Sequence, residues 1–115
     1  MEATQFLLFK RSIDPSALLI LWQVGLTGDL SLKRFDTEPK WLALLAEKLM
    51  QWYPGDHDVI LYEANIYPIG DCRAERVKLQ DLEHAVTSQI TTLVVPALTK
   101  PLEVDEFWRE RLEAI

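Results

Sequence analysis

The residues PKWLALLAEKLMQW, at positions 39–52, decide much of the predicted fold. Pro39 stands where a helix would begin, and in the first turn its missing N–H costs nothing. Apolar residues then recur at helical spacing, at Trp41, Leu45, Leu49 and Trp52. This spacing is typical of the apolar stripe of an amphipathic helix, so the stretch predicts a helix that packs against a core.

Short apolar or alternating runs on both sides of this helix predict β-strands. They lie at residues 6–9, 17–24, 59–62, 76–82 and 91–95. The run 19–22 has no polar alternation, which predicts a strand that is covered on both faces. Residues 103–115 predict a terminal helix with one apolar side.

This order predicts an α/β fold with two or more helices packed on a sheet of about five strands. The sheet should be mixed but largely antiparallel, because short connections cannot make parallel crossovers. Residues 1–100 are expected to form one domain, followed by a C-terminal helix at 101–115. A chain of 115 residues is long enough for one such core.

Composition excludes several classes of function. The net charge is −6 and no long basic run occurs, which argues against a nucleic-acid partner because phosphate binding needs clustered Lys and Arg. The longest apolar run, 17–22, is far shorter than a membrane span. One cysteine, Cys72, allows no disulfide within the chain. The start of the sequence lacks a basic signal-peptide region, so we expect a cytoplasmic protein without a membrane partner.

Familiar catalytic motifs are weak in this sequence. Asp56-His57-Asp58 contains three possible metal ligands, but no second cluster follows, so a polar turn is the favoured reading and no metal site is predicted. Cys72 with His57 or His84 could be a nucleophile and its base, but nothing in the sequence places them together, so a lone, partly buried thiol is the favoured reading. Gly25 and Gly28 are interpreted as turn residues that permit a positive φ.

Two strand ends offer the best candidate site. Glu63, Ala64 and Asn65 follow one strand, and Val95, Pro96 and Ala97 end another. Ligands of open α/β sheets gather beyond the carboxyl ends of strands, so both ends could frame one slot of adenine size. Ordinary strand ends with a solvated Glu63 are the alternative.

The same segments resemble the second half of tetrapyrrole methylase domains, in the branch that has a Trp-Gln-Val-Gly segment and includes peptide-backbone N-methylating relatives. The resemblance covers about residues 4–97. It rests on the order of the segments at 6–11, 14–15, 19–25, 28–29, 52–54, 56–57, 62–64, 66–68, 75–76, 79–82 and 90–96.

This resemblance implies two lobes with S-adenosylmethionine folded between them. The cofactor-binding residues implied for this chain are Phe9, Lys10, Glu63, Ala64, Asn65, Ile66, Val95, Pro96 and Ala97. Backbone contacts at Ala64 and Ala97 are expected first, and no catalytic residue is assigned.

The Gly-Pro-Gly-type loop of the family's first lobe is absent from this sequence. The resemblance therefore implies a partner, either a separate N-terminal lobe or a second copy in a homodimer. It also implies weak or absent binding of S-adenosylmethionine by this polypeptide alone, and its inactivity. The methyl acceptor would be a small molecule or a peptide. A non-catalytic binding or scaffold module, or an unrelated small ligand-binding α/β domain, are the alternatives.

Overall fold

The computed structural model describes residues 1–27, 38–64, 72–99 and 103–115. Its elements follow the order α1 (Ala3–Leu8), β1 (Leu19–Leu21), the 3-10 helix η1 (Val24–Leu26), α2 (Pro39–Leu49), β2 (Asp58–Glu63), β3 (Arg73–Lys78), the 3-10 helix η2 (Leu79–His84), β4 (Thr92–Val95) and α3 (Glu106–Glu113). No helix within these ranges is long and apolar enough to cross a membrane.

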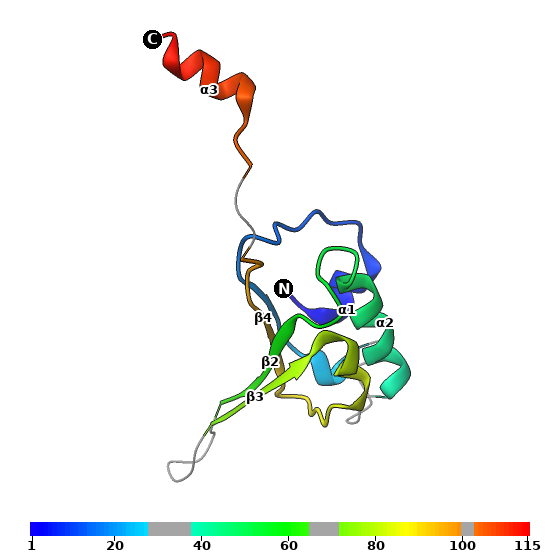
Figure 1. Cartoon of the computed structure of the whole chain (residues 1–115). Coiled ribbons are helices and arrows are strands. Elements are labelled where there is room, and N and C mark those ends of the chain that lie inside the picture. Colours follow the sequence, from blue (N-terminus) through cyan, green and yellow to red (C-terminus); the bar gives the residue numbers. More distant parts are fainter. Residues whose placement is uncertain (28–37, 65–71, 100–102) are drawn as a thin grey trace.

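The four described strands form one sheet in the order β1-β4-β2-β3, and every neighbouring pair is antiparallel. The predicted α/β class is therefore confirmed, whereas a fifth strand is not found in the described part of the chain. Helices α1, α2 and η2 lie against one face of the sheet (Figure 1).

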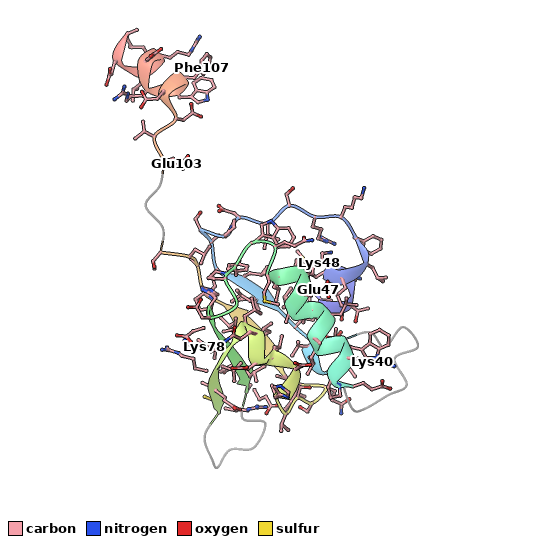
Figure 2. All side chains as sticks on the ribbon, turned by 45° about the vertical axis from the view of Figure 1, so that its right-hand side comes forward. Lys40, Glu47, Lys48, Lys78, Glu103 and Phe107 are labelled. Carbon is pink, nitrogen blue, oxygen red and sulfur yellow. The ribbon has the colours of Figure 1, made fainter. Side chains whose placement is uncertain are left out.

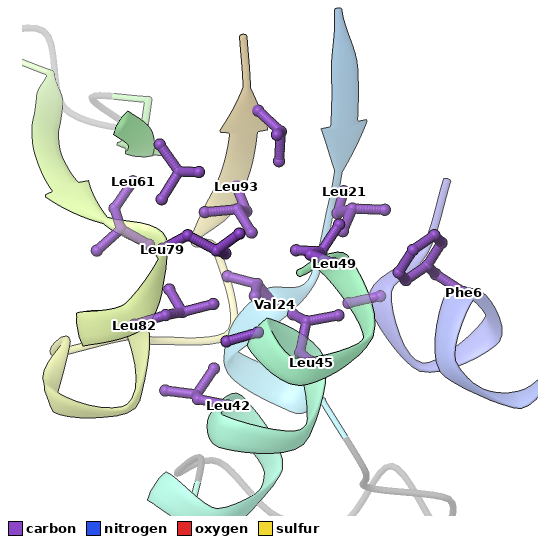
Figure 3. Packing of buried hydrophobic residues seen from close by; sticks show 14 of the residues in the cluster. Phe6, Leu21, Val24, Leu42, Leu45, Leu49, Leu61, Leu79, Leu82 and Leu93 are labelled. Carbon is purple, nitrogen blue, oxygen red and sulfur yellow. The ribbon is translucent and has the colours of Figure 1, made fainter. Parts of the chain in front are cut away.

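The core lies between this face and the helices (Figure 3). α2 contributes Leu42, Leu45, Ala46 and Leu49, which are all buried. They pack with buried sheet residues such as Leu21, Leu61 and Leu93. The predicted amphipathic helix is thus confirmed, although its buried stripe is shifted from the predicted one, since Trp41 and Trp52 are only partly buried.

The opposite face of the sheet is uncovered by any described helix. Ile20, Val94 and Ile60 lie side by side on this face, in register across β1, β4 and β2. Ile20 remains 44% exposed and Tyr62 39% exposed. The prediction that 19–22 would be covered on both faces is therefore wrong for the described structure.

The segment 6–9 was expected to be a strand, and this prediction is wrong because residues 3–8 form α1. The Glu2 carboxylate accepts hydrogen bonds from the N–H groups of Thr4 and Gln5, at 3.0 and 2.9 Å, and so caps the start of the helix. At the other end the Lys48 ammonium donates to the carbonyls of Phe6, Leu7 and Phe9. This cap comes from α2, so the local sequence of 6–9 does not reveal it.

The run at 76–82 is only partly a strand. β3 begins earlier, at Arg73, and ends at Lys78, after which η2 begins. Leu79 and Leu82 are both buried, three residues apart as a 3-10 helix requires. Val77 and Leu79 alone fit the alternating pattern that predicted a strand. Leu82, three residues after Leu79, fits the spacing of the 3-10 helix instead.

Candidate functional site

A groove of about 400 Å³ lies where β4 ends. Its lining comes from the turn before β2, from β3 and from the segment after β4. The lining residues are Pro54, Asp56, His57, Asp58, Arg76, Pro96, Ala97, Leu98 and Thr99. Two of the predicted site residues, Pro96 and Ala97, therefore contribute to a real concavity.

Antiparallel pairing brings these segments together. Ile60 of β2 lies opposite Val94 of β4, so the start of β2 lies beside the end of β4. The turn before β2 is closed by a 3.0 Å hydrogen bond from the His57 N–H to the Pro54 carbonyl. Beyond β4, the Leu98 N–H donates to the Pro15 carbonyl at 2.8 Å. Both segments of the groove are thus fixed by backbone hydrogen bonds.

His57 joins the two sides of the groove. Its Nε2 lies 2.7 Å from the Pro96 carbonyl oxygen. Because a carbonyl only accepts, Nε2 must carry the proton and donate. The imidazole also stacks on the Tyr53 ring, with centroids 5.0 Å apart and an interplanar angle of 21°. His57 therefore holds the strand end next to Ala97 in place.

Charges of both signs border the groove. Asp56 and Asp58 supply carboxylates, and Arg76 supplies a guanidinium. The Asp58 carboxylate pairs with the Lys78 ammonium at 2.8 Å. The hydrogen bond from Lys78 lowers the pKa of Asp58, which therefore stays ionised at neutral pH. Such a groove suits a small ligand that carries both a positive and a negative group.

Tyr53, which stacks on His57, is 2% exposed. Its hydroxyl is buried and has no hydrogen-bond partner among the described residues. Burial raises the pKa of Tyr53, and the Asp14 carboxylate adds to the effect. A buried hydroxyl without a partner costs about 1–3 kcal/mol of stability.

Replacing Tyr53 by Phe should therefore leave the free energy of unfolding unchanged or raise it by about 1 kcal/mol, because the unpaired hydroxyl is removed and the ring is kept. Urea denaturation measures this, with Tyr62→Phe as the control because Tyr62 is exposed. If Tyr53→Phe lowers the free energy of unfolding by more than about 1 kcal/mol and Tyr62→Phe does not, the Tyr53 hydroxyl does have a hydrogen-bond partner.

Glu63 lies at the other end of the sheet, in a polar network. Its Oε2 accepts hydrogen bonds from the Thr91 hydroxyl at 2.7 Å and from the Ser88 hydroxyl at 2.8 Å. Its Oε1 accepts one from Arg73 Nη1 at 3.3 Å. The bond from Thr91 is the main cause that lowers the pKa of Glu63. This carboxylate therefore ties the end of β2 to the start of β4.

The lowered pKa of Glu63 predicts a dependence of stability on pH. The ionised Glu63 carboxylate contributes fully to the free energy of unfolding above its unfolded-state pKa, about 4.3. This contribution is lost as the pH falls through the lower folded-state pKa. The difference in unfolding free energy between the wild-type chain and Glu63→Gln should therefore be constant near neutral pH and shrink below about pH 4.3. Urea titrations at a series of pH values from neutral to acidic measure this difference. If the difference stays constant over the whole pH range, the ionised Glu63 carboxylate does not stabilise the fold.

The predicted single slot does not form. Since β2 and β4 are antiparallel, with Tyr62 opposite Thr92, the carboxyl end of β2 lies beside the start of β4. Glu63 and Ala64 therefore lie at one end of the sheet, and Pro96 and Ala97 at the other. The prediction that both strand ends frame one site is wrong. One cofactor molecule cannot contact both ends in the way that the resemblance implies.

The remaining predicted residues are dispersed. Val95 is fully buried, so its side chain belongs to the core. Phe9 and Lys10 are exposed and border a shallow depression beside the end of α1 that does not include Ala97. Asn65 and Ile66 lie outside the described residues.

His57 and Arg76 are two of the groove residues that the sequence did not single out as a binding site. Asp56-His57-Asp58 was noticed only as a weak metal motif, and the described residues hold no group of three metal-ligating side chains. The signal that could have found His57 is its place directly before a strand that pairs with the strand ending at Pro96. The pairing of these two strands depends on the tertiary fold, so the local sequence around His57 does not reveal it.

The fold and the groove define a small α/β module with one covered sheet face and a ligand-sized groove at one sheet end. Among known proteins, this chain is similar to proteins named methyltransferase/ribosomally synthesized borosin cyclic peptide precursor. A type II protein of this name from Phlebiopsis gigantea is 33% identical over 102 residues, which cover 85% of this chain and 18% of the relative. A type III protein from Anomoporia bombycina is 35% identical over 95 residues, which cover 81% of this chain and 11% of the relative.

A precursor of the cyclic gymnopeptides from Gymnopus fusipes, also named a methyltransferase, is 32% identical over 101 residues, or 83% of this chain and 24% of the relative. The chain thus spans less than a quarter of the length of these curated relatives. No protein-family model matches the chain.

These comparisons correct the expected resemblance. The relatives are borosin precursor methyltransferases, and no family model supports tetrapyrrole methylases, so that assignment is wrong. The assignment depended on the order of short apolar segments. One of them, at 6–9, is not the strand that the order requires.

Proposed function

We propose that this chain is part of a methyltransferase that uses S-adenosylmethionine to methylate a peptide. The observation that carries the proposal is the similarity to borosin precursor methyltransferases over 81–85% of the chain in the first two relatives. Their names combine a methyltransferase with a cyclic peptide precursor, which favours a peptide over a small molecule as the acceptor.

We further propose that the groove at the end of β4 holds part of the cofactor. S-adenosylmethionine supplies an activated methyl group, and it carries an ammonium, a carboxylate and a sulfonium charge. Arg76 is suited to the carboxylate, and Asp56 to the ammonium. Ala97 leaves space for close approach, and its backbone groups can bind a flat ring. The volume of about 400 Å³ is in the ordinary range for small-molecule sites.

Donor and acceptor must be aligned in one closed site for methyl transfer by direct displacement. The groove is open, and the described residues provide no second wall. We therefore propose that the rest of a longer protein closes it, in keeping with the small share of each relative that this chain matches. The uncovered sheet face at Ile20, Val94 and Ile60 is the surface proposed for that contact, since large apolar patches mark partner surfaces.

A chimera tests this function. The matched 102 residues of the Phlebiopsis gigantea relative would be replaced by the corresponding residues of this chain. We expect the chimera to methylate the relative's own peptide segment when S-adenosylmethionine is supplied, which mass spectrometry detects. A folded chimera that neither transfers methyl groups nor binds S-adenosylhomocysteine would contradict the proposed function.

A pair of variants tests the groove separately. Ala97→Trp fills the groove and should lower methyl transfer by at least about tenfold, because a loss of about 1.4 kcal/mol of binding corresponds to that factor. Val86→Trp is the control, since Val86 is 79% exposed and precedes the start of β4. Equal activity of the two variants would exclude the groove as the cofactor site. It would not contradict the proposal that the chain is part of a methyltransferase.

A further inference from the structure

A long connection leads from α1 to β1. This strap, defined as residues 9–18, contains no helix or strand, and most of its side chains are exposed. In both views of the molecule, the turn between α2 and β2 extends toward the strap (Figures 1 and 2). The middle of the strap is tied to the groove at the end of β4, because the Pro15 carbonyl accepts the hydrogen bond from the N–H of Leu98, which lines that groove. The strap therefore lies next to one wall of the groove.

The two neighbours of Ala97 in the chain are held by different segments. The Pro96 carbonyl accepts a hydrogen bond from His57, whose ring stacks on that of Tyr53. Leu98 is held by the strap instead. The position of Ala97 in the groove thus depends on two holders, the Tyr53–His57 pair and the strap. A bond between these two holders would fix Ala97 from both sides.

Each holder carries a polar atom with unused hydrogen-bonding capacity. The Tyr53 hydroxyl is buried and has no hydrogen-bond partner among the described residues. Asp14 stands directly before Pro15 on the strap, and its Oδ1 accepts hydrogen bonds from the N–H and the hydroxyl of Ser16, at 2.9 and 2.5 Å. Within the described ranges these two bonds leave its other oxygen, Oδ2, available as an acceptor. Burial raises the pKa of Tyr53 and the Asp14 carboxylate adds to this rise, so the two groups are close neighbours.

We propose that Tyr53 and Asp14 are positioning residues that form a latch when the cofactor binds. In the closed latch the Tyr53 hydroxyl donates a hydrogen bond to Asp14 Oδ2 and so holds the strap against the end of β4. This inference rests on the proposed function, because the cofactor is the ligand that fills the groove. A cofactor in contact with Ala97 orders the residues on both sides of it, and this lowers the entropy cost of ordering the strap. By linkage, the closed latch strengthens cofactor binding by the same factor by which the cofactor favours closure.

Opposing contributions to the free energy explain why the latch is open without the cofactor. Closure removes the exposed Asp14 carboxylate from water and orders an exposed segment, and both changes cost free energy. In return the buried Tyr53 hydroxyl gains a partner, and a hydrogen bond to an ionised acceptor is about twice as strong as one between neutral groups. The contribution from the bound cofactor therefore decides between the open and the closed state.

The chimera with the Phlebiopsis gigantea relative tests the latch, with Tyr53→Phe and Asp14→Ser introduced singly and together. Serine at position 14 keeps an oxygen for the turn with Ser16 but lacks Oδ2. We expect each substitution to raise the dissociation constant of S-adenosylhomocysteine and the KM for S-adenosylmethionine by at least about tenfold, with kcat unchanged. The double variant should bind no more weakly than the single variants, because either substitution alone removes the bond.

Ser12→Ala is the matched control, since Ser12 is an exposed residue of the same strap, and this variant should bind like the unsubstituted chimera. Hydrogen exchange followed by mass spectrometry measures closure directly. Residues 9–18 should exchange more slowly once S-adenosylhomocysteine is added, and Tyr53→Phe should abolish this change. Equal affinities in all variants would overturn the latch but not the groove as the cofactor site. A folded chimera that binds no S-adenosylhomocysteine would contradict the proposed function and the latch together.

Urea denaturation of the 115-residue chain without ligand adds a second measurement, because it separates a latch from a permanent structural bond. The latch is open in this state, so Tyr53→Phe should not lower the free energy of unfolding. A permanent bond between Tyr53 and Asp14 would make Tyr53→Phe lose stability as well as affinity. That result would overturn a latch that closes only when the cofactor binds.

Discussion

Gly25→Ala should lower the free energy of unfolding by about 3 kcal/mol, the upper end of the usual cost of overpacking. A Cβ atom at Gly25 would lie 1.7 Å from the Ser88 carbonyl oxygen and 2.3 Å from its carbonyl carbon. Both are backbone atoms, so one of the two chain segments must move. That movement would also disturb the Ser88 hydroxyl, which donates to Glu63.

Gly55→Ala is the matched control for this change. Its added Cβ would lie 3.0 Å from Gln80 Oε1, the end of a flexible side chain that can move aside. We expect a cost below about 1 kcal/mol, measured by urea denaturation of both variants. Equal losses in the two variants would contradict the close approach of Gly25 to Ser88.

Leu93→Ala should lower the free energy of unfolding by about 3–5 kcal/mol. Leu93 is fully buried, and it pairs with Leu21 on one side and with Leu61 on the other. Its removal leaves a cavity between the sheet and α2 (Figure 3). The next residue, Val94, points to the uncovered face of the sheet and is only partly buried.

Val94→Ala is therefore expected to cost less than about 1.5 kcal/mol, since a side chain that is partly exposed has less burial to lose. Chemical denaturation of the two variants compares the two faces of the same strand directly. If Val94→Ala cost as much as Leu93→Ala, the outer face of the sheet would be covered in solution, by another segment or by a second molecule.

The helix at 39–49 and the strands β2 and β4 could be predicted because each carries its signal locally. α2 begins at Pro39 and repeats leucine at helical spacing. α1 could not be predicted in this way, because its caps include Lys48, which is 42 residues away from Phe6 in the sequence. Gly25 also gave a misleading signal. The positive φ of 57° belongs to Gln23, whereas Gly25 is needed for the close approach to Ser88.

The candidate site was predicted in part, for a similar reason. Pro96 and Ala97 do line the groove, because a strand end followed by small residues is a local feature. The prediction that Glu63 lies in the same site is wrong because β2 and β4 run antiparallel. The sequence of neither strand determines their relative direction. The place of His57 in the groove depends on the 2.7 Å contact between its Nε2 and the Pro96 carbonyl oxygen. These two residues are 39 positions apart, so the local sequence does not reveal the contact.

A titration of the isotopically labelled chain with S-adenosylhomocysteine, followed residue by residue by NMR, is the most direct test of the central claim. If the groove at the end of β4 holds the methyl donor, the amide signals of Ala97, Leu98 and Thr99 and the ring signals of His57 will shift and saturate. Shifts confined to Glu63 and Ala64, at the other sheet end, would contradict the account.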